Sequence, residues 1–552
     1  MEGGAPASGG ASLREDRPWL LPTAVALAGA VAYLLWDPPS ADRAAALFRV
    51  DLFEREGFTL FSTAWYGGHH TPGYSVLYPA LGAWLGARLC AALAAVAATA
   101  FVALLAGERG RAAGLLFVPG ILASLVSGRL AFTLGVGAAT GAVLAAARGR
   151  TWLAAAAGAL TALCSPVAAL FAALAGAALA GAALAGAALP GAALAGGTVP
   201  LIFRGQSPSY SGDSPRPGVG LVVGAAVPTV FLLVAFPEGG DFPFVPSAFW
   251  PTFGAAVLVA VGAPAQWRAV RVGAVLYAAV ALAAFAIPTP IGGNASRLGT
   301  LFAPAVAGLA LWPRRKIVLA VLALPIAYWT LQPAVRDWLR AHDDPSTESA
   351  FYAPIAPWLE RRQPARVEVP FTQSHGEAFH LARHFPIARG WNRQLDRERN
   401  RLFYDGVLTP ERYAVWLRAN AIRYVAVPLR LPMDESGERE KTLALAGAAG
   451  LREVLRAGEW RVMEVGDPRP LADGAATVTE VKPEGFVLNT TQPGTSTIRV
   501  RFTPYWKLLE GEGCVEPAPG GWTRVRVREA GRIEVGTSFA LGRVRSEEPR
   551  CS

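Results

Sequence analysis

The sequence is poor in charged residues. Asp, Glu, Lys and Arg make up 17% of its 552 residues, whereas hydrophobic residues make up 53%. A soluble domain usually has roughly 25% charged residues, so the deficit indicates that lipid solvates much of the chain. Between residues 20 and 330 charges occur only in short clusters, but from residue 331 onward Arg, Asp and Glu recur every few positions. Two different environments are therefore predicted for the two parts of the chain.

Cysteine is also scarce, with four residues of two kinds. Cys90 and Cys164 lie in apolar runs, where a cysteine is a small hydrophobic residue. Cys514 and Cys551 lie in the polar C-terminal part, and we expect a disulfide between them if that part is outside the cytoplasm. A cleavable signal peptide is not recognisable: residues 1–18 are predicted to be a cytoplasmic tail, and the first apolar run to be an uncleaved anchor.

The net charge of +10 does not indicate nucleic-acid binding. Basic residues of the first part flank hydrophobic runs, as membrane topology requires, and those of the second part alternate with acids. Basic clusters occur at 108–111, 148–150, 268–271 and 314–316. If all four are cytoplasmic, the chain is a multi-pass protein of the plasma (inner) membrane. It then has about eleven transmembrane helices between residues 19 and 331, a cytoplasmic N-terminus and an extracytoplasmic C-terminal part.

The first predicted external loop, residues 37–75, has the most potential for chemistry. Residues 44–56 are predicted to form an amphipathic helix on the membrane surface, with Asp51 and Glu54 on neighbouring faces. Glycines that follow Trp65 and Tyr66 allow a tight backbone path beside a ligand. The adjacent His69 and His70 come next, but their spacing does not support a metal site because neighbouring side chains point in different directions.

Two arginines are expected at the outer membrane edge. Arg129 follows a short hairpin, and Arg297 belongs to a Gly-Gly-Asn-Ala-Ser-Arg sequence that includes Asn294. Arginine at that depth can bind a lipid phosphate bidentately or extend to the interface, and for Arg297 both interpretations stay open. A histidine-rich segment at 375–384 lacks the spacing of a zinc protease motif, and we expect the polar face of a surface helix there.

Several segments resemble known membrane proteins. The external loop with an acid near a surface helix and an aromatic-Gly-Gly turn resembles the GT-C class of membrane glycosyltransferases. The chain is also similar to bacterial, mostly actinobacterial, integral membrane proteins labelled YfhO-like or 6-pyruvoyl-tetrahydropterin synthase-related. The segments that carry this similarity are 65–79, 236–240, 288–298 and 388–396.

The resemblance implies transfer of a sugar from a polyprenyl-phosphate donor to a cell-envelope glycan or lipid acceptor at the outer face. Asp51 would be the catalytic base, with Glu54 as its rival. The remaining candidates would bind substrate, the arginines through the lipid phosphate: Tyr66, His69, His70, Arg129, Asn294 and Arg297. One aspartate stands where other members have an Asp-Asp pair, so participation of a divalent cation stays open.

The polar part is predicted to form two extracytoplasmic domains, an α/β domain at 332–473 and a β-sandwich-like domain at 474–552. Short helices are expected near 354–360, 377–384 and 409–420, and alternating residues near 496–502 and 522–528 are typical of sandwich strands. A lipid or glycolipid transporter, or a non-enzymatic envelope-assembly protein, is the alternative function. A transporter would carry an inverted repeat and polar groups near the bilayer centre, whereas here charges gather at the outer edge, which favours the enzyme.

Overall fold

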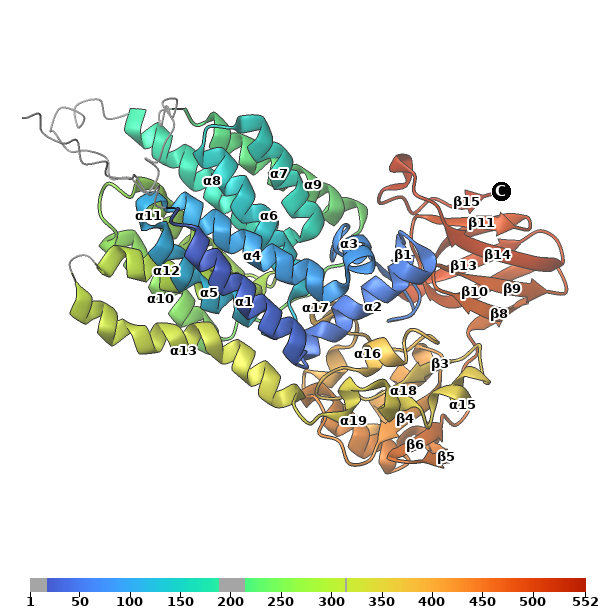
Figure 1. The fold of residues 1–552 in the computed structure, drawn as a ribbon. Helices are drawn as coiled ribbons and strands as arrows, with labels where there is room; N and C mark the ends of the chain where they lie inside the picture. Colours follow the sequence, from blue (N-terminus) through green and yellow to red (C-terminus); the bar gives the residue numbers. More distant parts are fainter. Residues whose placement is uncertain (1–16, 188–213, 313–314) are drawn as a thin grey trace, which may run out of the picture.

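The computed structural model describes residues 17–187, 214–312 and 315–552. The predicted tail at 1–18 lies almost entirely outside these ranges. The chain folds into a helical bundle, an α/β domain and a β-sandwich (Figure 1).

The bundle has a helix at each of the eleven predicted crossings. These are α1 (Leu20–Trp36), α4 (Ala87–Leu105), α5 (Gly110–Val126), α6 (Leu130–Ala147), α7 (Thr151–Cys164), α8 (Pro166–Ala187), α9 (Arg216–Ala235), α10 (Pro246–Gly262), α11 (Arg268–Ala286), α12 (Ser296–Leu311) and α13 (Lys316–Ala341). Within the described ranges, seven helices are long and apolar enough to cross a membrane, or up to eight if a bent pair is one span. The multi-pass membrane fold is confirmed, while the count of eleven crossings stays a prediction.

Glycine allows the bundle helices to approach closely. A Cβ atom on Gly224 of α9 would lie 2.0 Å from the backbone oxygen of Ala155 in α7. A Cβ on Gly176 of α8 would lie 2.7 Å from the backbone oxygen of Gly218 in α9. Small residues of this kind let helices pack by van der Waals contact where lipid removes the hydrophobic drive for association.

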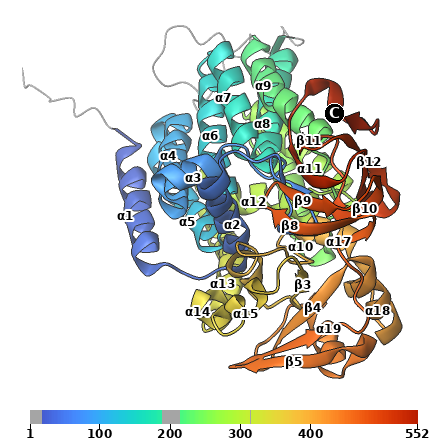
Figure 2. The ribbon, with the colours of Figure 1, turned by 90° about the vertical axis from the view of Figure 1, so that its right-hand side faces the viewer.

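The surface helix predicted at 44–56 is α2 (Ala41–Glu56), which follows α1 at an angle of 83°. Pro38 and Pro39 separate the two helices, and the residue before a proline is disfavoured in a helix. A hairpin of β1 (Phe61–Ser62) and β2 (His69–His70) and the short helix α3 (Tyr78–Leu85) come next. Figure 2 shows α2 between the bundle and the two C-terminal domains.

The α/β domain contains a four-stranded sheet in the order β3-β4-β6-β5, in which only the β3–β4 pair is parallel. Its strands are β3 (Arg366–Glu368), β4 (Ile422–Pro428), β5 (Arg452–Ala457) and β6 (Trp460–Glu464). Its helices are α14 (Ser349–Tyr352), α15 (Ala356–Glu360), α16 (Glu377–His380), α17 (Arg393–Arg399), α18 (Pro410–Ala419) and α19 (Glu435–Leu445).

The last domain is a β-sandwich, as the alternating sequence predicts. One sheet has the order β15-β12-β13-β10-β7 and the other β11-β14-β9-β8, and side chains of both form one apolar core. The strands are β7 (Ala472–Gly474), β8 (Ala476–Lys482), β9 (Gly485–Thr490), β10 (Gly494–Arg501), β11 (Trp506–Glu510), β12 (Gly513–Ala518), β13 (Trp522–Val527), β14 (Gly531–Thr537) and β15 (Arg550–Cys551).

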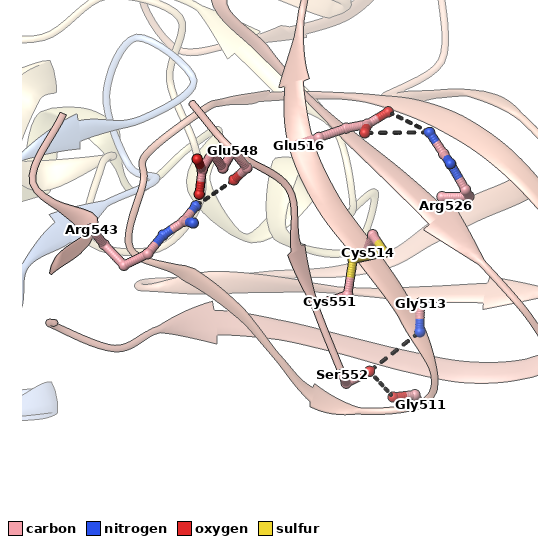
Figure 3. Close-up of a disulfide and its surroundings, with 9 residues drawn as sticks. All are labelled: Gly511, Gly513, Cys514, Glu516, Arg526, Arg543, Glu548, Cys551 and Ser552. Carbon is pink, nitrogen blue, oxygen red and sulfur yellow. Dashed lines mark hydrogen bonds and ion pairs between the residues drawn. A yellow bond between two sulfur atoms is a disulfide. The ribbon is translucent and has the colours of Figure 1, made fainter. Parts of the chain in front are cut away.

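A disulfide between Cys514 and Cys551 fastens the last strand, β15, to β12 (Figure 3). Ser552 adds a hydrogen bond, because the Gly513 amide donates to its hydroxyl at 3.3 Å. The two-residue β15 would otherwise be held by few contacts. The covalent link therefore closes the edge of the five-stranded sheet.

Replacement of both Cys514 and Cys551 by serine is expected to lower the stability of the sandwich by about 2–4 kcal/mol, since the disulfide closes a loop of 37 residues. A thermal melt of the purified protein followed by hydrogen exchange in residues 472–552 measures this. The Cys90→Ser variant is the control for loss of a thiol. A melt of the double variant that matches the wild type would contradict the expected role.

Candidate functional site

A small cavity opens where α6 and α12 begin. It lies between these two helices, the last turns of α5 and the middle of α13. Arg129 and Arg297, named separately from the sequence, both line it. The hydroxyl residues Ser124, Ser127, Thr300 and Thr330 also line it.

The backbone around this cavity is arranged to attract an anion. Arg129 is the residue before the first turn of α6, and Arg297 lies in the first turn of α12. The start of a helix carries partial positive charge and unpaired N–H groups, which makes it a common site for phosphate. Two helix starts and two guanidinium groups therefore place positive charge on one small volume.

Several polar atoms of the cavity lack a protein partner. The hydroxyls of Ser127 and Thr330 and Nε of Arg129 are buried without a hydrogen bond. The guanidinium of Arg297 lies over the ring of Phe132 at 5.1 Å, and within the described ranges it forms no ion pair and donates no hydrogen bond. Buried polar groups in native proteins are nearly always paired, so these atoms fit a ligand with several acceptor oxygens.

Two carboxylates lie beside Arg129 without binding it tightly. Asp42 of α2 comes within 3.7 Å of Nε, and Asp337 of α13 within 3.8 Å of Nη2. Both distances exceed that of a normal hydrogen bond. The side chain of Asp42 is 37% exposed, and neither Asp42 nor Asp337 lines the cavity itself. No local pattern in the sequence distinguishes Asp42 from the other acids of the loop.

Asp51 lies on the other side of α2. Asp51 and Asp42 are nine positions apart, about two and a half helical turns, and so face nearly opposite directions. The Asp51 carboxylate accepts from Arg383 of the α/β domain at 2.6 Å and pairs with Arg55 at 2.9 Å. Glu54 is exposed and makes no ion pair with any residue that the structure describes. Neither acid lines the cavity of Arg129 and Arg297.

Tyr66 and His69 are buried at the junction of the loop with the C-terminal domains. The Tyr66 hydroxyl donates to the backbone oxygen of Gly390, in the α/β domain. His69 is fully buried, stacks on Trp65 with a centroid distance of 5.1 Å, and has no hydrogen bond to either ring nitrogen. Burial lowers the pKa of His69 to about 3; the nearby Glu238 opposes this shift, and Arg49 and Arg399 add to it.

His70 belongs to an ion-pair network that the sequence did not reveal. Its ring lies 3.1 Å from Glu238, and Glu238 also lies 3.4 Å from Arg399 of α17. Burial raises the pKa of Glu238, but Arg399, His70 and His69 outweigh burial and lower it to about 2. The Pro-Glu-Gly-Gly sequence around Glu238 was part of the family resemblance, but only the fold shows its partners.

Asn294 is buried in the 3-10 turn η3 (Gly292–Ala295), which leads into α12, and its side chain faces the backbone oxygen of Pro290 at 3.5 Å. It shapes the approach to Arg297 rather than lining the cavity. A cluster of three or more His, Cys, Asp or Glu side chains that could hold a metal is not found within residues 17–187, 214–312 and 315–552.

The expectation of a polar surface helix at 375–384 is wrong for its first part. His375 and Glu377 are buried, and His375 stacks on Trp391 with a centroid distance of 3.6 Å. The α-helix there is only four residues long, because the chain turns at His375 with a positive φ of 53°. Only the end of the segment is on the surface: Arg383 and His384 are exposed, and His384 pairs with Glu360 at 2.7 Å.

No family model and no curated protein matches the chain. Among solved structures it is similar to the arabinofuranosyltransferase AftD from Mycobacteria, at 14% identity and a TM-score of 0.42, over 95% of this chain and 60% of that one. It is also similar to ArnT from Cupriavidus metallidurans in the apo state, at 15% identity and a TM-score of 0.38, over 80% of this chain and 97% of that one. A second ArnT structure, bound to undecaprenyl phosphate, matches at 14% identity and a TM-score of 0.38.

The chain thus spans 60% of the length of the AftD chain. These matches are distant. The YfhO-like label stays a prediction.

The low pKa of His69 predicts that its site loses stability on acidification. Below about pH 6.5 the unfolded chain protonates this histidine, while the folded protein keeps it neutral down to about pH 3, so protons favour unfolding. The His69→Phe variant keeps a ring on Trp65 and removes the titration. Its melting temperature should fall less than that of the wild type between about pH 7.5 and about pH 4.5. The exposed His342→Phe variant is the control, and an identical fall in all three proteins would contradict the burial of a neutral His69.

Proposed function

We propose that the protein is a GT-C-type glycosyltransferase that binds the phosphate of a polyprenyl-phosphate sugar in the cavity of Arg129 and Arg297. The observation that carries this proposal is the convergence of two helix starts, two guanidinium groups and buried unpaired hydroxyls on one small volume. A phosphate supplies the charge and the acceptor oxygens that this volume lacks.

The surroundings of the cavity support a lipid as the carrier of that phosphate. α13 forms one wall through Thr330, and its neighbouring residues Leu324, Tyr328 and Leu331 are exposed. An exposed apolar side beside a cationic cavity fits an isoprenoid chain attached to a phosphate. The neighbour ArnT has been solved with undecaprenyl phosphate bound, a ligand of the same chemical class.

Charge at the two ends of the bundle supports an extracytoplasmic site. α6 starts at the end of the bundle nearest α2 and runs to the opposite end, where Arg148 and Arg150 follow it. Arg268 and Arg271 start α11 at that same far end, since α11 leads back to the turn before α12. The positive-inside rule then places the far end in the cytoplasm and the cavity with the C-terminal domains outside.

The base in this proposal is Asp42 rather than Asp51. The acceptor hydroxyl attacks the anomeric carbon, the bond from that carbon to the phosphate oxygen breaks, and the phosphate leaves with the electron pair. Asp42 accepts the hydroxyl proton, and Arg129 and Arg297 stabilise the charge on the phosphate. Asp42 lies beside Arg129 with only a loose contact, whereas both oxygens of Asp51 are bound by arginines on the other side of the helix. Asp51, the base expected from the family resemblance, stays the alternative.

The Asp42→Asn variant is expected to lose activity by about 100-fold or more, because it removes the proton acceptor. Asp51→Asn should retain activity within about tenfold, since its pairs with Arg383 and Arg55 hold α2 in place rather than touch substrate. The measurement is transfer from a panel of labelled polyprenyl-phosphate pentoses and hexoses by purified protein. Full activity of Asp42→Asn together with loss of activity in Asp51→Asn would show that Asp51 is the base. Unchanged activity in both variants would show that neither aspartate of α2 is the base.

Binding tests the phosphate site without knowledge of the sugar. The affinity for undecaprenyl phosphate should fall by about tenfold or more in Arg297→Gln, because charge-assisted hydrogen bonds to the phosphate are lost. The Arg340→Gln variant is the matched control, since Arg340 is exposed near the end of the neighbouring α13. Equal affinity of the two variants would place the lipid phosphate elsewhere.

A further inference from the structure

A second cavity lies along the C-terminal half of α2. It is a shallow hollow bordered by α2, the loop that follows it and the start of α3. Arg49 is the charged residue that lines it, with Thr59, Thr71 and Ser75 as hydroxyl residues. None of its lining residues belongs to the cavity of Arg129 and Arg297.

Arg49 is a buried cation without a counter-ion. Its side chain is 3% exposed, Nη1 donates to the backbone oxygen of Ala45 at 2.8 Å, and Nε has no partner. Within the part of the chain that the structure describes, no carboxylate lies within ion-pair distance of it. The guanidinium lies 3.9 Å from the ring of Tyr74 and 5.0 Å from that of Trp65.

Aromatic rings offset only part of the cost of burying a charge. Most N–H groups of this guanidinium are still unused, and they lie at the wall of a cavity. These donors are suited to an anion with several acceptor oxygens.

The rim of the cavity has a different character. Phe53, Val76 and Pro79 line it, and Phe58 at its edge is 53% exposed. The helix α3, which begins beside the cavity, carries Trp84 with 81% of its surface exposed. Exposed aromatic residues on short surface helices are typical of the membrane interface. A cationic floor beneath an apolar rim that is partly exposed matches an anionic headgroup attached to an acyl chain.

We propose that this cavity binds the phosphate of an anionic membrane lipid. The phosphate oxygens accept hydrogen bonds from the unused N–H groups of Arg49, and an acyl chain lies against Phe53 and Phe58. Arg49 and Asp42 are seven positions apart, about two helical turns, so both belong to one side of α2. The site is separate from the cavity of the proposed transfer reaction and does not depend on that reaction.

Native mass spectrometry of the full-length protein in detergent tests this site. The probes are dioleoylphosphatidylglycerol and, as the lipid without net charge, dioleoylphosphatidylcholine. All variants carry Arg297→Gln, so that the first cavity does not contribute. The parent should prefer phosphatidylglycerol by about tenfold or more, and Arg49→Gln should abolish that preference. Arg55→Gln removes a cation from the same helix that is already paired with Asp51 and should keep the preference.

Three outcomes would overturn the proposal. An unchanged preference in Arg49→Gln would exclude Arg49 as the binding group, and an equal loss in Arg55→Gln would show that net charge alone is responsible. Complete displacement of the lipid by millimolar inorganic phosphate would show a small-anion site rather than a lipid site.

The Arg49→Lys variant distinguishes a role of Arg49 in lipid binding from a role in the stability of the fold. It keeps the charge but loses the planar stack on Tyr74, so it should keep part of the lipid preference. If the Lys variant loses the preference as completely as the Gln variant and both melt earlier than the parent without lipid, Arg49 is structural and the proposal fails.

Discussion

The docking of the loop after α2 onto the two C-terminal domains determines where α2 lies. Trp65 donates from its indole to the backbone oxygen of Ala378 at 3.0 Å, and Tyr66 bonds to the segment of Gly390. On the sandwich side, the Arg501 amide donates to the backbone oxygen of Gly67 at 2.7 Å. One short loop thus bonds to both domains, and α2 is held between them and the bundle. The direction in which Asp42, Arg49 and Asp51 point follows from this docking.

Burial of positive charge at the end of the bundle nearest α2 is the second constraint. Arg49, Arg129 and Arg297 come from different helices, and none has a carboxylate at hydrogen-bond distance in the described chain. The buried Arg389 of the α/β domain, in contrast, contacts both Asp396 at 2.7 Å and Glu440 at 3.2 Å, whereas the buried Arg366 of that domain bonds only to backbone oxygens in the described chain. Two carboxylates therefore neutralise Arg389, whose role is structural. Arg49 and Arg297, which have no ion pair in the described chain, fit anionic ligands, while Arg129 is shared loosely between Asp42 and Asp337.

The elements could be predicted from the sequence because their signals are local. Apolar runs placed the bundle helices, and alternation placed β10 (Gly494–Arg501) and β13 (Trp522–Val527). The helix expected at 44–56 is present as α2, but its residues 44–46 and 48–52 are buried, so it is not the amphipathic helix that the sequence predicted. The convergence of Arg129 and Arg297 could not be read from the sequence, because it requires the starts of α6 and α12 to be neighbours. The same holds for the choice between Asp42 and Asp51: both are acids of one helix, and only packing decides which side meets the bundle. The pairing of Glu238 with His70 and Arg399 joins segments far apart in the chain, for which no local pattern exists.

A structure of the full-length protein with undecaprenyl phosphate, determined in a lipid nanodisc, tests the central claim most directly. The account predicts density for the phosphate between the first turns of α6 and α12, within hydrogen-bond distance of Arg297, with the isoprenoid chain along α13. Phosphate density bound away from both Arg129 and Arg297 would contradict it.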